Sequence, residues 1–174
     1  MENLNLAPRT TLIIILLIGV FLFFLFYFEQ NFYNQVDDSS KTEHVNVDRN
    51  LLITKPSSPF KDSIAVGVLE HNKASSVRIK VGDITNLDTT NAPDFDAILI
   101  MHRWVAGAPI DIVQSFMEKN MESKNKIVVL TTSWNGLEKM EHIDALTGAS
   151  IMDDVPDFTD KVIARLDQLL ALKD

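Results

Sequence analysis

The sequence predicts a small α/β domain with a mostly parallel sheet, preceded by one transmembrane helix. Residues 12–28 form one long apolar run without a charge. Residues 97–101 and 127–132 are short apolar runs typical of strands that are buried on both faces. An amphipathic pattern over residues 109–119 separates them, and a crossover helix of this kind is what two parallel neighbouring strands require.

Length and composition limit the classes of protein that the chain can belong to. Its 174 residues suffice for an anchor, a linker and one domain. The formal charge of −8, without any cluster of Lys and Arg, argues against a nucleic-acid partner. Because the chain has no cysteine, disulfides, thiolate catalysis and cysteine-based metal sites are excluded.

The first residues predict a signal anchor. We expect residues 1–10 to be a short cytoplasmic N-terminus and residues 11–28 to be the transmembrane helix, because the uncharged run is near the lower length limit for crossing a bilayer. Arg9 precedes this run, and the first lysine after it is Lys41. The positive-inside rule therefore favours a single-pass protein of the cell membrane with its N-terminus inside and its C-terminal domain outside.

A polar linker is predicted between the anchor and the domain. Residues 29–59 are poor in apolar side chains and contain two prolines near their end, a composition that does not pack on its own. The apolar residues within 44–54 could add an edge strand to the sheet. The domain itself is expected over residues 60–174.

Two further strands are predicted near the start of the domain. Residues 64–69 are a short apolar run, and residues 77–81 alternate between apolar and charged side chains. Only residues 70–76 separate these runs, so we expect a hairpin or an irregular link between them.

Two amphipathic helices are predicted in the second half of the domain. The first begins near Pro109 and Asp111, and the second ends the chain. The apolar stripe of the first consists of Ile112, Val113, Phe116 and Met117. The stripe of the second consists of Val162, Ile163, Leu166, Leu169 and Leu170.

The middle of the chain resembles the flavodoxin-like family. Residues 95–120 read FDAILIMHRWVAGAPIDIVQSFMEKN and residues 124–136 read KNKIVVLTTSWNG: a buried strand, a loop with an aromatic residue and Ala-Gly, a helix beginning near a proline, and a second buried strand. The resemblance implies a three-layer flavodoxin-like domain. Flavodoxins hold the flavin phosphate in a loop between the first strand and the first helix. Since no TxTGxT-like sequence occurs here, the resemblance implies a degenerate member that lacks this loop.

Both tryptophans are expected just beyond the carboxyl ends of adjacent buried strands, the edge where α/β sheets bind ligands. There Trp104 and Trp134 could stack on a planar ligand, with His102 and Arg103 binding or protonating an anionic group. Alternatively, the two rings cover the top of the core while the two cationic residues face water. We favour this second interpretation.

Residues 144–150, DALTGAS, resemble the Dxx(S/T)GA(T/S) motif of extracytoplasmic FMN-binding domains. In that family a flavin transferase esterifies FMN to the last hydroxyl of the motif. The resemblance implies that Ser150 accepts the flavin, with Asp144, Thr147 and Gly148 completing the motif. The alternative is a turn in which Asp144 caps nearby amides and Gly148 has a positive φ angle.

No catalytic motif is present. HExxH, GxSxG, Walker and GxGxxG patterns do not occur, so no catalytic or metal-binding residue is assigned and an enzyme is not favoured. The favoured interpretation is a non-catalytic binding or accessory module without a cofactor and with an unidentified protein partner. The alternative is an extracytoplasmic electron-transfer flavoprotein with FMN covalently attached at Ser150.

Overall fold

The computed structural model describes residues 16, 18–20, 23, 49–140 and 143–171. They belong to two units, Met1–Thr42 and Glu43–Asp174. In the first unit the described residues are helical. Most of the predicted transmembrane segment, and the linker up to residue 48, lie outside the described residues. None of the described helices combines the length and the apolar character needed to cross a membrane.

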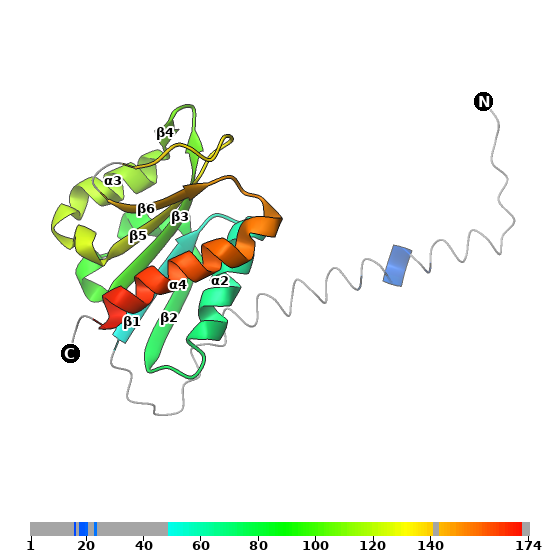
Figure 1. Ribbon diagram of the computed structural model, residues 1–174, viewed down its shortest axis with the longest axis horizontal. Coiled ribbons are helices and arrows are strands. Elements are labelled where there is room, and N and C mark those ends of the chain that lie inside the picture. Colours follow the sequence, from blue (N-terminus) through cyan, green and yellow to red (C-terminus); the bar gives the residue numbers. More distant parts are fainter. Residues whose placement is uncertain (1–15, 17, 21–22, 24–48, 141–142, 172–174) are drawn as a thin grey trace, which may run out of the picture. The chain divides into compact units, whose positions relative to one another are not determined.

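The second unit is built on a sheet whose five longer strands are all parallel (Figure 1). These strands are β1 (Arg49–Lys55), β2 (Val77–Asp83), β3 (Ala97–Val105), β5 (Ile127–Thr132) and β6 (Asp144–Gly148). Their order is β2-β1-β3-β5-β6, and the two-residue strand β4 (Ala108–Pro109) pairs antiparallel with the end of β3. Numbered along the chain, the parallel strands have the order 2-1-3-4-5, which is that of the flavodoxin-like doubly wound fold.

Helices cover both faces of this sheet and complete the three layers that the sequence predicts (Figure 1). Helices α2 (Pro59–His71) and α4 (Val155–Ala171) pack on one face. Helix α3 (Asp111–Lys119) and the 3₁₀ helix η2 (Ile84–Thr89) pack on the other. Three more 3₁₀ turns lie in the connections: η3 (Ala92–Asp94), η4 (Met121–Lys126) and η5 (Met152–Asp154).

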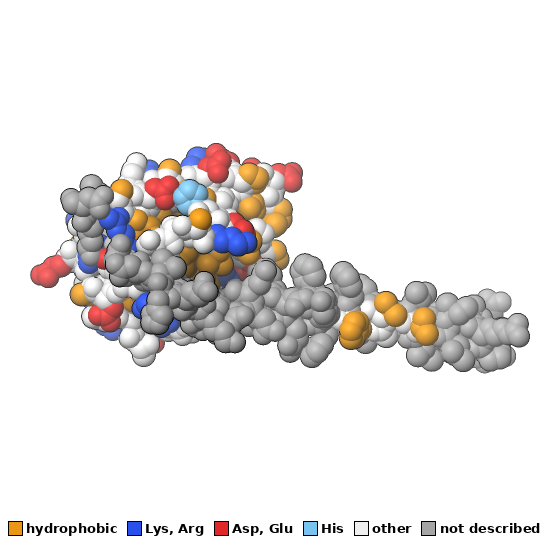
Figure 2. Space-filling model, turned by 90° about the horizontal axis from the view of Figure 1, so that it is seen from below, with side chains coloured by type: hydrophobic (Ala, Val, Ile, Leu, Met, Phe, Trp, Pro, Cys, Tyr) orange, Lys and Arg blue, Asp and Glu red, His pale blue; other side chains and the backbone are white. Residues whose placement is uncertain are grey.

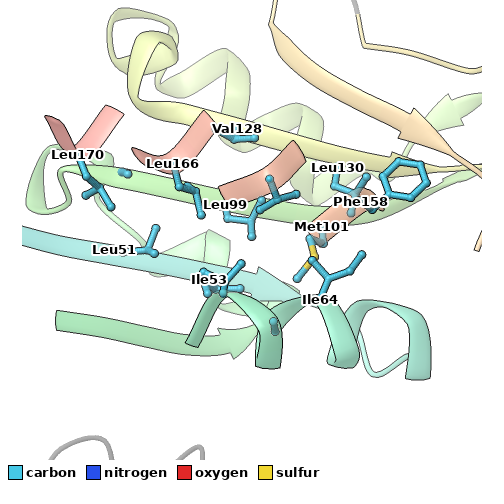
Figure 3. Packing of buried hydrophobic residues seen from close by; sticks show 14 of the residues in the cluster. Leu51, Ile53, Ile64, Leu99, Met101, Val128, Leu130, Phe158, Leu166 and Leu170 are labelled. Atoms are coloured by element: carbon cyan, nitrogen blue, oxygen red, sulfur yellow. The ribbon is translucent and has the colours of Figure 1, made fainter. Parts of the chain in front are cut away.

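The core has two halves because the central strands are buried on both sides. Alternate side chains of a strand point to opposite faces, so Leu51, Ile53 and Leu99 face α2 and α4, whereas Leu52 and Ile98 face η2 and α3. Figure 3 shows the first half, with Ile64, Phe158 and Leu166 from the two helices lying against the strands. Each large apolar side chain buried in this way contributes roughly 1.5–3 kcal/mol.

Several predicted elements are confirmed. The runs 97–101 and 127–132 are strands that pair in parallel, and helix α3 connects them. The alternating residues 77–81 lie in β2, and the chain ends in helix α4, as predicted.

The prediction for the start of the domain is wrong in part. Residues 49–55, predicted as the end of the linker or as an edge strand, form β1 in the interior of the sheet between β2 and β3. The reason is that residues 51–54 are buried on both faces, which only an interior strand allows. This segment therefore belongs to the domain.

The predicted strand over residues 64–69 is wrong, because these residues lie in helix α2. Phe60, Ile64, Ala65 and Val68 are buried and recur at helical spacing, and Pro59 stands at the first turn. The predicted hairpin over residues 70–76 is accordingly a connection from a helix to a strand.

The turn interpretation of the segment 144–150 is also wrong. Residues 144–148 form strand β6, and Gly148 is not among the glycines with positive φ, which in the described residues are Gly107 and Gly136. The reason for glycine at position 148 is packing, because a Cβ atom there would lie 2.2 Å from Cζ of Phe158.

We predict that Gly148→Ala destabilises the domain by about 1–3 kcal/mol, the usual range for overpacking a core. Phe158→Leu should remove most of this penalty, so the double variant should lose less stability than the sum of the two single variants. Urea unfolding followed by circular dichroism measures all three. Strict additivity of the two losses would show that the ring contact does not explain this glycine.

Candidate functional site

The chain reverses its winding direction at the carboxyl ends of β1 and β3. After β1 it continues into α2 on one face of the sheet, and after β3 it continues into α3 on the other. In open α/β sheets, ligands bind in the crevice outside the strands at such a switch point. This edge is therefore the first place to look for a site.

Buried polar side chains gather at this edge, and we call them the edge cluster. Six polar or charged residues are buried in the described part of the chain, and all but Asn72 belong to the cluster. Its members are Thr54, Lys61, His102, Thr131 and Thr132. Burying a polar group is costly unless it has partners, so each member requires a physical account.

On the α3 face, a histidine is held in one neutral form. His102 is fully buried; its Nδ1 lies 3.1 Å from the carbonyl oxygen of Arg103 and its Nε2 lies 2.9 Å from Oγ1 of Thr131. A carbonyl only accepts, so Nδ1 carries the proton and Nε2 accepts from the threonine hydroxyl. Burial lowers the pKa of His102 to about 4, partly offset by its backbone hydrogen bond, so the ring is neutral at physiological pH.

Thr54 lies on the same face, as the penultimate residue of β1 before the switch point. Its Oγ1 is buried and has no hydrogen-bonding partner among the described residues. An orphaned hydroxyl of this kind costs about 1–3 kcal/mol, unless a water molecule or a ligand group satisfies it.

The α2 face carries a buried amine. Lys61, in the first turn of α2, is 3% exposed, and its Nζ donates to Oγ1 of Thr132 at 2.8 Å. No carboxylate of the described residues forms an ion pair with it, because its neighbour Asp62 pairs with Lys55 instead. Buried charges are normally paired, so this ammonium group is an exception.

The electrostatic environment of Lys61 opposes its protonation. Burial is the largest cause, the positive charge of Arg103 is the second, and Asp62 offsets them in part. Together they lower the pKa of Lys61 to about 8. Lys61 and Arg103 thus repel each other, and the one carboxylate of the described residues that offsets them, Asp62, is paired with Lys55. Perturbed groups of this kind gather at sites that bind or transform ligands.

The loop between the first strand and the first helix completes the edge. Residues 56–58, Pro-Ser-Ser, connect β1 to α2, and Ser58 at the helix N-cap makes no side-chain capping bond. The first amides of a helix have no partner within it and attract anions. The connection that corresponds to the flavodoxin phosphate loop therefore lies at residues 56–58 and not at residues 70–76, and it has no TxTGxT-like sequence.

The structure separates the four residues predicted for a ligand edge. His102 and Arg103 are neighbours in β3 and point to opposite faces, the first buried and the second exposed. Trp104 is half-buried within β3, its ring centroid 6.4 Å from that of His102, whereas Trp134 is fully exposed in the loop after β5. Arg103 and His102 both interact electrostatically with Lys61, whereas Trp134 makes no ring contact with the other three in the described part of the chain.

The residues of the predicted flavin-attachment motif lie along and beyond β6. The strand begins at Asp144, and Oγ1 of Thr147 donates to the carbonyl oxygen of Glu138. Gly148 ends the strand, and Ser150 is exposed two residues later at the same edge as the cluster. Flavin attachment at Ser150 stays a prediction.

Sequence reasoning missed Lys61, although a signal was present. With α2 as a helix, Lys61 shares a face with Ala65 and Val68, so a lysine occupies the apolar stripe. Because residues 64–69 were assigned to a strand, this helical spacing went unrecognised.

The rest of the surface offers no comparable feature on the face seen in Figure 2. Acidic and basic side chains are interspersed there, without one dominant sign. A shallow depression lined by Asn91, Pro93 and residues 118–123 lies near the amino ends of β3 and β5, away from the edge cluster. Its lining contains none of the buried polar residues.

Comparisons with known proteins agree with the fold but do not establish a family. No family model and no curated protein matches the chain. A flavodoxin from the domain Archaea is similar in structure, with a TM-score of 0.47 and 12% identity over 69% of this chain and 98% of its own. Megasphaera elsdenii flavodoxin is similar with a TM-score of 0.48 and 14% identity, over 67% of this chain and 98% of its own.

A multidomain structure is also similar. The Flv1 flavodiiron core from Synechocystis sp. PCC6803 has a TM-score of 0.49 and 11% identity over 74% of this chain, and the match spans 38% of that protein. All three scores are below 0.5, so the assignment rests on the parallel strand order 2-1-3-4-5. This order and the edge cluster define the chain as a flavodoxin-like domain with a cationic group at its switch point.

We predict that Lys61→Met stabilises the domain at pH 7 by about 1–3 kcal/mol, because it removes an unpaired buried charge. The lysine binds its proton less tightly in the folded state than in the unfolded state, so wild-type stability rises as pH increases from about 8 toward 10.5. The advantage of the variant should therefore shrink across this window. Urea unfolding at pH 7, 9 and 10 measures it.

The matched control is Lys73→Met, which removes an exposed lysine near the end of the same helix. Its effect should stay small and constant with pH. Parallel stability curves for wild type and Lys61→Met would contradict the assignment of a buried, unpaired amine.

Proposed function

We propose that the chain is a membrane-anchored binding module whose flavodoxin-like domain holds a phosphate-type anion at the edge cluster. The observation that carries the proposal is the buried Lys61 ammonium group, which Arg103 repels and which forms no ion pair with a carboxylate in the described part of the chain. A bound anion would neutralise both cations and accept hydrogen bonds from them. Pro59 has no N–H, so the amides of α2 that would add donors on the same face begin at Phe60.

The cofactor implied by the flavodoxin resemblance fits this site at its phosphate end. Lys61, Arg103 and the amides at the start of α2 would hold the phosphate of FMN. FMN would supply one- and two-electron redox chemistry when bound. Covalent attachment at Ser150 is supported by the motif resemblance of residues 144–150 and by the exposure of Ser150 at the same edge.

Anchoring in the membrane is part of the proposal. It is supported by the uncharged run over residues 12–28 and by the placement of Arg9 before it and acidic residues after it. We expect protease added to intact cells to remove the domain. Complete protection of the domain, alongside cleavage in permeabilised cells, would show that it lies on the inner side.

Titration of the full-length protein with inorganic phosphate and with FMN, followed by calorimetry, tests the binding site. Arg103→Met and Lys61→Met should each weaken binding at least about tenfold, since each removes a charged hydrogen-bond donor worth about 1.5–3 kcal/mol. Arg78→Met, which removes an exposed cation near the start of the edge strand β2, should leave affinity unchanged.

Equal losses in all three variants would indicate unspecific attraction and contradict the site. Absence of binding by the wild type would contradict the proposal itself. Intact mass and a visible spectrum of protein from its native host would report an attached flavin, which Ser150→Ala should remove.

A further inference from the structure

The same buried amine has features of a nucleophile as well as of an anion-binding group. Its single hydrogen-bonding partner within the described residues, Thr132, donates its own hydroxyl proton to the carbonyl oxygen of His102 at 3.2 Å. The threonine can therefore only accept from Lys61. When the amine is neutral, its lone pair is left unengaged.

The charged groups around Lys61 come from three elements, and their balance favours the neutral amine. Arg103 on β3 repels the ammonium form, and Lys55 on β1 neutralises Asp62, the one carboxylate next to Lys61 on α2. Lysines beside another cation in a desolvated site serve as nucleophiles in enzymes. With its pKa lowered to about 8, Lys61 has a much larger neutral fraction near pH 7.5 than an ordinary lysine.

We propose that Lys61 is a reactive amine that forms a reversible imine with an aldehyde or ketone carrying an anionic group. The inference rests on the proposed function, because Arg103 and the first amides of α2 would hold the anionic group of the compound. The position of Lys61 in the first turn of α2 brings its amine to the same edge.

The reaction needs no oxidant, reductant or further reactant. The Nζ lone pair attacks the carbonyl carbon, and the carbonyl oxygen takes up a proton to give a carbinolamine. The C–O bond then breaks with loss of one water molecule, and a C=N bond forms between the ligand and Lys61. Hydrolysis reverses both steps, so the amine is regenerated.

Pyridoxal 5′-phosphate is a suitable probe, with pyridoxal as the matched aldehyde without a phosphate. The full-length protein is incubated with each at pH 7.5, reduced with borohydride to fix any imine, and mapped by peptide mass spectrometry. We expect Lys61 to be labelled by pyridoxal 5′-phosphate at least about tenfold faster than the exposed Lys73 and Lys161. Inorganic phosphate should slow this labelling, and pyridoxal should react more slowly.

The outcomes separate this inference from the proposed function. Labelling of Lys61 no faster than that of Lys73 would overturn the inference, whereas calorimetric binding of phosphate would still support the anion site. Rapid labelling by both aldehydes without any effect of phosphate would overturn the role of the anionic group. Arg103→Met should reduce labelling by pyridoxal 5′-phosphate more than labelling by pyridoxal, because Arg103 would hold the anionic group in addition to disfavouring the ammonium form of Lys61.

Discussion

The burial of β1 between β2 and β3 is the constraint on which the rest of the structure depends. Its residues Leu51, Leu52 and Ile53 contribute to both halves of the core, so the strand is fixed in register with both neighbours. Because β1 ends at Lys55, the chain must turn within residues 56–58 before α2 begins. That short turn brings the first helical turn, and Lys61 with it, over the end of β5, where Thr132 receives its hydrogen bond.

The edge cluster is neutral on one face of the sheet and cationic on the other, because neighbouring residues of a strand point to opposite faces. The α3 face holds the neutral network of His102 and Thr131 together with the unsatisfied Thr54. The α2 face holds Lys61, with Arg103 adjacent and Thr132 as its acceptor. The backbone links the two, since Thr132 bonds to the carbonyl oxygen of His102. The cationic groups of the cluster therefore lie on one face only, and the neutral histidine adds no charge to that face.

Much of the fold follows from patterns that the sequence displays directly. Runs 97–101 and 127–132 are buried strands because nearly every residue is apolar, and the stripe of α3 has helical period. The first strand and the first helix of the domain, β1 and α2, were harder to predict. The run 64–69 is short, contains β-branched residues and includes Gly67, so its period alone does not distinguish a strand from a helix. The contact that justifies Gly67 comes from Thr159 of α4, far along the chain.

The site was less predictable than the fold because it depends on assigning residues 59–71 to a helix. Trp104, Trp134 and Arg103 could be placed at the carboxyl edge from their positions after apolar runs, and the strand order places them there. Lys61 joins them only once residues 59–71 are a helix that follows an interior strand. A lysine within an apolar helical stripe then becomes informative, because burying its charge costs several kcal/mol unless a partner compensates it. Among the described residues, Thr132 is the hydrogen-bond acceptor of Lys61 and no carboxylate forms an ion pair with it. A bound anion and loss of the proton are two ways to compensate such a charge, and anion binding and amine reactivity rest on them.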